Sequence, residues 1–68
     1  MRYGICKLSV VPMRKECSHK SELVSELLFN DIYEIIEEND EWVKIRCSYD
    51  LYEGWIRKLQ HYELNDKQ

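Results

Sequence analysis

The feature that most constrains the fold is an alternation of apolar and polar side chains with a period of two residues. It is clearest in Glu41–Ser48, where one face is aliphatic and the other carries a tryptophan and two cations: Val43, Ile45 and Cys47 against Trp42, Lys44 and Arg46. Because successive side chains of a strand point to opposite faces, this segment is predicted to be a strand. Its aliphatic face should enter the core, which places Trp42 on the opposite face.

Four other segments are predicted to be strands, which indicates an all-β domain: Ile5–Met13, Glu22–Phe29, Asp31–Glu38 and Glu53–Ile56. The leucines of Glu22–Phe29 would also suit a short helix. We predict a strand there because the turn residues Asn30 and Asp31 end the segment after eight residues.

The connections are predicted from their polarity. Arg14–Ser21 should be an exposed loop, Glu38–Glu41 a tight hairpin and Arg57–Gln60 a single 3₁₀ turn, while Tyr62–Leu64 should pair with the first strand. This arrangement favours a small barrel or a pair of orthogonally packed sheets.

The chain has 68 residues, enough for one domain with one core. A domain of this size buries only about 60% of the surface that its unfolded chain exposes, so each core residue matters. The residues predicted to be mostly buried are Val10, Leu23, Val24, Leu27, Tyr33, Ile35, Val43, Ile45 and Ile56.

The charge of the chain limits the partners that it can bind, and its cysteine content indicates the compartment in which it works. Ten basic and 13 acidic residues give a net charge of -3, which argues against binding to nucleic acid or to an anionic membrane. The three cysteines are odd in number, which argues against a disulfide framework. With no leader visible at the N-terminus, we expect a cytoplasmic location; a periplasmic or cell-wall location is the alternative if a leader was removed.

Few residues are candidates for catalysis, metal binding or ligand binding. Cys17 and His19 place a thiol and an imidazole in one loop, but the sequence predicts no group to orient the histidine, so we interpret the segment as a mobile polar loop. The cysteines and histidines match no zinc-binding spacing, and no metal or cofactor is expected. Two interpretations of Trp42 stay open: a residue that covers the barrel rim, or a contact for a ligand or partner, in which case its ring would be exposed beside Lys44 and Arg46.

Arg14 at the start of the loop is expected to have a structural role. It should pair with a carboxylate near the loop base, and Glu16 is one option.

Three runs of the sequence together resemble a known family: MRKECS with SELV at Met13–Ser18 and Ser21–Val24, WVKIR at Trp42–Arg46 and YEGWI at Tyr52–Ile56. In this order and spacing they look like the bacterial SH3-like (SH3b) domain at the N-terminus of NlpC-type cell-wall peptidases, over roughly residues 4–64. The chain differs from the family at Cys17, where proline is common. It also differs at Asn30, which replaces a glycine but can still adopt a left-handed conformation.

The resemblance implies a small SH3-like barrel of five or six short strands with one 3₁₀ turn. Residues 1–64 would form the single domain and residues 65–68 a frayed tail. In the family this domain is non-catalytic and precedes a cysteine peptidase domain that cleaves γ-D-glutamyl–diamino-acid bonds in peptidoglycan peptides. In some members the long first loop helps to wall the active-site cleft. The chain has no Asp-Cys-Ser-Gly nucleophile signature, so we expect no catalysis from it, and a longer parent protein would be a cysteine peptidase.

Two functions are therefore carried forward. The first is an accessory domain that positions or restricts the substrate of such an endopeptidase; the alternative is a freestanding SH3-like module that binds a peptide or protein. The expected partner is a peptidoglycan-derived peptide or a C-terminal peptidase domain, and the chain is expected to be a monomer. The residues expected to bind are Glu16, Ser18, His19, Trp42, Tyr49 and Tyr52.

Overall fold

The computed structural model describes residues 2–48 and 51–64, which form six strands and one 3₁₀ turn. The elements are β1 (Tyr3–Ile5), β2 (Val10–Arg14), β3 (Leu23–Leu28), β4 (Ile32–Glu38), β5 (Trp42–Cys47), β6 (Glu53–Arg57) and η1 (Lys58–Gln60). The predicted all-β content, the strand at Glu22–Phe29 and the 3₁₀ turn are confirmed. The predicted first strand is wrong in extent, because residues 6–9 separate β1 from β2. No helix in the described part of the chain is long and apolar enough to cross a membrane.

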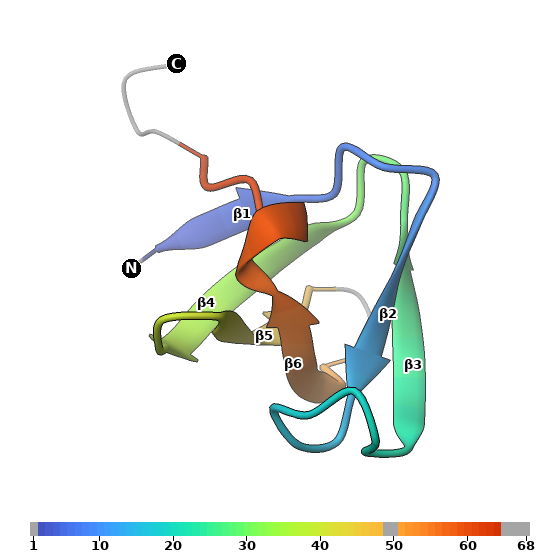
Figure 1. Cartoon of the computed structure of the whole chain (residues 1–68). Coiled ribbons are helices and arrows are strands. Elements are labelled where there is room, and N and C mark those ends of the chain that lie inside the picture. Colours follow the sequence, from blue (N-terminus) through green and yellow to red (C-terminus); the bar gives the residue numbers. More distant parts are fainter. Residues whose placement is uncertain (1, 49–50, 65–68) are drawn as a thin grey trace.

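The strands form one antiparallel sheet in the order β1-β4-β5-β6-β2-β3. Figure 1 shows β2 and β3 standing at a steep angle to β1 and β4, with β6 between the two groups, so the sheet bends around one interior. The end strands β1 and β3 do not pair with each other, and the barrel that we expected is therefore not closed. β2 joins β6 through a single registered pair, Arg14 with Trp55, which leaves this seam weakly bonded.

The last described residues pair with the first strand, β1. The amide of Ile5 donates to the carbonyl of Tyr62 at 2.9 Å, and the amide of Leu64 donates to the carbonyl of Tyr3 at 2.8 Å. An isolated antiparallel bridge joins Gly4 to Glu63 between these two bonds. The predicted pairing of Tyr62–Leu64 with the first strand is confirmed, while the predicted frayed tail lies outside the described residues.

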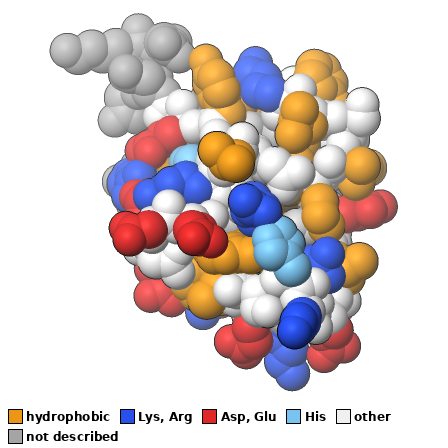
Figure 2. All heavy atoms as spheres, viewed as in Figure 1, with side chains coloured by type: hydrophobic (Ala, Val, Ile, Leu, Met, Phe, Trp, Pro, Cys, Tyr) orange, Lys and Arg blue, Asp and Glu red, His pale blue; other side chains and the backbone are white. Residues whose placement is uncertain are grey.

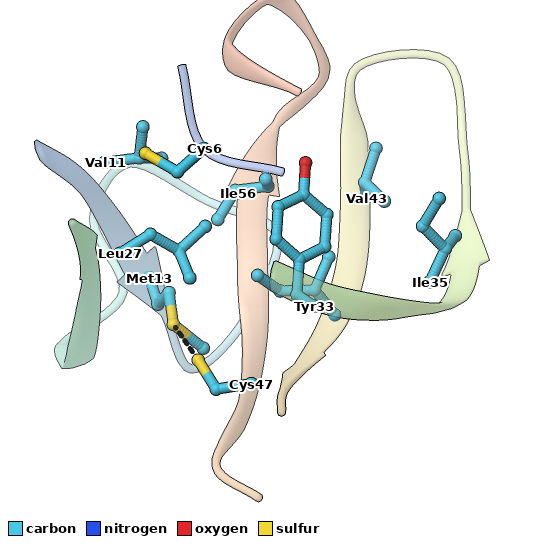
Figure 3. Packing of buried hydrophobic residues seen from close by; sticks show 10 residues of the cluster. Cys6, Val11, Met13, Leu27, Tyr33, Ile35, Val43, Cys47 and Ile56 are labelled. Carbon is cyan, nitrogen blue, oxygen red and sulfur yellow. Dashed lines mark hydrogen bonds between the residues drawn. The ribbon is translucent and has the colours of Figure 1, made fainter. Parts of the chain in front are cut away.

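One cluster of buried side chains fills the bend of the sheet (Figure 3). Its members are Cys6, Val11, Met13, Leu27, Tyr33, Ile35, Val43, Ile45, Cys47 and Ile56, with Val24 packed against it. Tyr33 is the largest side chain that is wholly buried, and the chain leaves room for its ring at Gly4. A Cβ atom at Gly4 would lie only 2.6 Å from the Tyr33 hydroxyl oxygen, so this position requires glycine.

Two predicted core residues are exposed. Val10 is 46% exposed because its neighbour Val11 points inward, and adjacent residues of a strand face opposite sides. Leu23 is 56% exposed because of a β-bulge: the register between β2 and β3 shifts after Met13, so that Arg14 pairs with Leu23. An extra residue in one strand reverses the alternation beyond it, which turns Val24 toward the core and Leu23 away from it.

The connection from β3 to β4 needs a left-handed residue, and Asn30 supplies it with φ of 72°. Its amide donates to the carbonyl of Cys6 at 2.8 Å, and a carboxylate oxygen of Asp31 accepts from the amide of Leu28 at 2.8 Å. The expectation that Asn30 can replace the family's glycine is confirmed.

Candidate functional site

The loop between β2 and β3 is held by its own hydrogen bonds. The amide of Lys15 donates to the carbonyl of Glu22 at 2.9 Å, and the amide of Glu16 donates to the hydroxyl of Ser21 at 2.8 Å. At the tip, the hydroxyl of Ser18 accepts from the amide of Lys20 at 3.1 Å. Local side-chain bonds of this kind fix turn geometry, so the loop that we interpreted as mobile has a defined internal structure.

Arg14 closes the base of this loop. Its Nη1 donates to the main-chain carbonyl of Ser21 at 3.0 Å. We expected Arg14 to pair with a carboxylate near the loop base, with Glu16 as one option, and this is wrong. Within the described residues, the hydrogen bond of its guanidinium goes to the backbone, and the remaining donors of the group are available to other acceptors.

Trp42 begins β5 on the face opposite Val43, as the alternation predicts. The side chain of Asn39 fixes the turn before it, because its Oδ1 accepts from the amides of Glu41 at 2.9 Å and Trp42 at 2.8 Å. The Trp42 side chain lies outside the main cluster, yet the residue is only 7% exposed. The expectation of an exposed aromatic surface at Trp42 is therefore wrong, and the reason is the two side chains that cover it.

His19 and Arg57 cover the indole. The ring of His19 meets the ring of Trp42 edge-on with 5.1 Å between centroids, and the guanidinium carbon of Arg57 lies 5.7 Å from the centroid of Trp42. Arg57 is the registered partner of Trp42 across the β5–β6 hairpin. Its Nη1 donates to Nε2 of His19 at 2.7 Å, since a guanidinium can only donate. The loop is thus attached to the sheet by a histidine that packs on tryptophan and accepts from arginine.

A cavity of about 190 Å³ opens between this loop and strands β2, β5 and β6. Six side chains line it: Pro12, Arg14, His19, Trp42, Arg57 and Gln60. The lining combines an aromatic ring and a proline with two guanidinium groups, and it contains no acidic residue. Figure 2 shows Lys and Arg side chains gathered around a histidine on the face seen there, with hydrophobic side chains between them. Such a pocket is suited to a small group that is apolar on one side and negatively charged on the other.

The sequence matches a known family, described as the bacterial dipeptidyl-peptidase SH3 domain, over residues 13–60. The chain belongs to this family. The match begins in β2 and ends in η1, so the SH3 domain includes all the residues that line the pocket except Pro12. No curated protein and no solved structure matches the chain significantly. The predicted resemblance to a peptidase-type bacterial SH3b domain is confirmed, and SH3b domains are typically non-catalytic.

The SH3 domain brings together two of the six residues expected to bind, His19 and Trp42. Glu16 and Ser18 do not line the pocket, and their described hydrogen bonds shape the loop instead. Tyr52 lies near the other end of β5, because its carbonyl accepts from the amide of Cys47. Five residues of strand separate that point from Trp42, roughly 16 Å at about 3.3 Å per residue. Tyr49 lies outside the described residues.

The sequence reasoning did not identify Pro12, Arg57 and Gln60 as parts of the site. Arg57 could have been found by pairing the two strands of the last hairpin, since the residue opposite Trp42 shares its face. Pro12 and Gln60 had no such signal, because their place depends on how β2 and η1 approach the sheet. Among residues 2–48 and 51–64, no group of three or more His, Cys, Asp and Glu side chains could hold a metal ion.

A second polar cluster lies outside the pocket lining and joins the beginning and the end of the described chain. The hydroxyl of Tyr33 lies 2.7 Å from Nδ1 of His61. Arg2 donates to the carboxylate of Glu63 from Nε at 2.8 Å and from Nη2 at 2.6 Å. Burial raises the pKa of Tyr33 to about 12 and lowers the pKa of His61, while the bonds from Arg2 lower the pKa of Glu63. The neutral forms of Tyr33 and His61 therefore stabilise the fold, and this cluster has a structural role.

Proposed function

We propose that the chain is the non-catalytic SH3 domain of a bacterial NlpC-type peptidase and that it positions or restricts a peptidoglycan-derived peptide. The substrate class is the peptide that carries a γ-D-glutamyl–diamino-acid bond, recovered from wall turnover in the cytoplasm. The family match supports the association with a peptidase. The observation that carries the proposal is the pocket beneath the β2–β3 loop, in which His19 and Arg57 frame the ring of Trp42.

The pocket has the properties that peptide binding requires. Trp42 and Arg57 belong to the residue types that dominate binding energy at interfaces, and both sit on strands that hold them in place. The loop that carries His19 is closed by internal hydrogen bonds, so little conformational freedom is lost when a ligand binds. In a peptidase, the same loop would face the catalytic domain and form one wall of its cleft.

A freestanding interaction module is the second candidate. It rests on the same pocket, in which Trp42 and Arg57 are residue types that dominate binding energy at interfaces. The two candidates differ in what the domain does to a peptidase. An accessory domain changes the range of peptides that a separately expressed NlpC-type peptidase domain cleaves, whereas a freestanding module binds peptide and leaves that range unchanged.

The test of the proposal is a titration of wall-derived peptides against the wild-type chain and Trp42→Ala. A contact of this kind should weaken binding by about 2 kcal/mol or more when truncated, and the chain alone should cleave nothing. Trp55→Ala is the matched control, because Trp55 lies on β6 but does not line the pocket. Unfolding curves must show that both variants are folded.

Trp42 is mostly buried, so His19→Ala provides a second route to the same answer. His19 is exposed and lies outside the core, and its removal uncovers the indole without emptying the interior. We expect His19→Ala to change peptide affinity while the unfolding midpoint stays close to that of the wild type. Equal peptide affinity in the wild type, Trp42→Ala and His19→Ala would refute the proposed binding site.

A further inference from the structure

We propose that the pocket is a carboxylate subsite: it takes one acidic group of the peptide between Arg14 and Arg57, with the adjoining apolar atoms against Trp42 and Pro12. This inference rests on the proposed function and names the chemistry that the site recognises. Four observations lead to it: the pairing of the arginines, a buried donor without an acceptor, the geometry of its free edge and the volume of the cavity.

Within the described residues, two of the four arginines have carboxylate partners and two do not. Arg2 pairs with Glu38 and Glu63, and Arg46 pairs with Glu34 and Glu53. Arg14 and Arg57 have no carboxylate partner there; their contacts are a main-chain carbonyl and the ring of His19. In a chain with three more acidic than basic residues, the two arginines without an acidic partner are the two that line the pocket.

Arg57 also carries a donor that nothing in the described structure satisfies. Its Nε is buried and has no hydrogen-bond partner. A buried donor on a charged group that lacks an acceptor destabilises the protein, and proteins generally provide a partner for such groups. In this conformation Nε is shielded from water and from an entering ligand alike, so an acceptor can reach it only if the side chains that cover it shift when the ligand enters.

The free edge of Arg57 has the geometry of a carboxylate fork. Nη1 is engaged by His19, which leaves Nε and Nη2 on the other side of the guanidinium. Arg2 uses this pair of nitrogens to bind both oxygens of Glu63 in the same molecule. Paired N–H···O bonds between arginine and carboxylate are stronger and more directional than single bonds to a neutral acceptor. The ligand group that fits this edge is therefore a planar carboxylate.

The volume sets the size of the ligand group. A cavity of about 190 Å³ is smaller than the roughly 300–1,000 Å³ of pockets that enclose a drug-sized ligand, so it suits a part of a peptide the size of one residue and not a whole peptide. One residue with a free carboxylate fills it, whether the carboxylate is the C-terminus of the peptide or an acidic side chain. Trp42 and Pro12 provide the apolar contact for the rest of that residue.

The test uses three acetylated tetrapeptides that differ only in their carboxylates. The first is tetra-alanine with a free C-terminus, the second is its C-terminal amide, and the third is the amide with one alanine replaced by glutamate. Binding to the full chain is followed by the NMR signal of the Trp42 indole N–H. We expect the free acid, the glutamate peptide or both to bind at least tenfold more tightly than the uncharged amide. The tighter of the two identifies the source of the carboxylate.

Arg57→Gln should abolish this preference and reduce the charged peptides to the affinity of the amide. Lys20→Gln is the matched control: it removes the same charge from the neighbouring loop, does not line the pocket and should keep the preference. Arg57→Lys, which retains the charge but loses the fork, should keep only part of it. Unfolding midpoints confirm that each variant is folded.

The outcomes separate this inference from the proposed function. If all three peptides bind the wild type alike and Trp42→Ala weakens all three, the pocket binds peptide but is no carboxylate subsite. A preference that survives in Arg57→Gln also overturns the inference. If none of the peptides binds, or if Trp42→Ala binds them as the wild type does, the inference is wrong, and the titration of wall-derived peptides decides the proposed function separately.

Discussion

Tyr33 and His61 show how single residues determine the conditions under which the domain is stable. The phenol ring lies in the core while its hydroxyl reaches Nδ1 of His61 and accepts from the amide of Tyr62 at 3.3 Å. Ionisation of the phenol would place a negative charge in the core, which explains the raised pKa. Protonation of His61 is opposed by burial in the same way. The domain is therefore stabilised by keeping both side chains neutral.

The raised pKa of Tyr33 predicts a loss of stability at alkaline pH. As the pH rises above 10, Tyr33 ionises in the unfolded chain before it ionises in the fold, where its pKa is about 12. The free energy of unfolding should therefore fall between pH 10 and pH 12, by about 2 to 3 kcal/mol at most. Tyr33→Phe should lack this part of the decline. Denaturant unfolding of both proteins at pH 8 to 12 measures it, and parallel profiles would contradict the assignment.

Trp42 marks the limit of prediction at the scale of the residue. The alternation of β5 correctly placed its ring on the face opposite Val43, because a period of two residues is a local property of the strand. Its burial is not local. His19 comes from a distant loop, and Arg57 comes from the next strand of the hairpin. A residue can be assigned to a face from its own segment, but what covers that face depends on contacts between segments.

At the scale of the element, hydrophobic patterns predicted the strands well and the bulges poorly. Leu23–Leu28 is a strand despite its leucine-rich pattern, and β4 and β5 pair as expected. The bulges after Met13 and after Ile35 left no clear mark in the sequence. Each reverses which residues face inward, so Leu23 was assigned to the core although it is exposed.

The inward face of β5 can be tested with a pair of isoleucines. Ile45 is wholly buried, whereas Ile36 on the adjacent strand β4 is 38% exposed. Ile45→Ala should reduce the free energy of unfolding by roughly 2–5 kcal/mol, because it removes packed methyl and methylene groups and leaves a cavity. Ile36→Ala makes the same chemical change and should cost much less. Denaturant unfolding of both variants decides the matter, and equal losses would show that the face is wrongly assigned.

At the scale of the whole molecule, the number of strands was predicted correctly, but the prediction of a closed barrel was wrong. The sheet bends enough to enclose the core, but β1 and β3 do not pair with each other, and the outer edge of β1 pairs with Tyr62–Leu64 instead. Closure depends on how far the strands shift and twist relative to one another, and short strands with few glycines do not encode this in a local pattern. The same bend brings β2, β5 and β6 beside the β2–β3 loop and so creates the pocket.

Packing of the whole molecule also predicts how the thiols react. Cys6 and Cys47 are buried in the core, where the thiol of Cys47 donates to the sulfur of Met13 at 3.5 Å, whereas Cys17 is exposed on the loop. A thiol reagent should modify one cysteine rapidly in the native protein and three after denaturation without reductant. Fewer than three reactive thiols in the denatured protein would argue against a reducing compartment.

The central claim is that the domain binds peptide in the pocket between the β2–β3 loop and the sheet. The most direct measurement is a map of backbone and indole NMR shifts as a wall-derived peptide is added to the full chain. The account predicts that the largest changes occur at the residues that line the pocket, Pro12, Arg14, His19, Trp42, Arg57 and Gln60, with little change at the exposed pair Val10 and Leu28. Saturable changes centred on β3 or on the end of β5 near Tyr52, with the pocket unaffected, would contradict it.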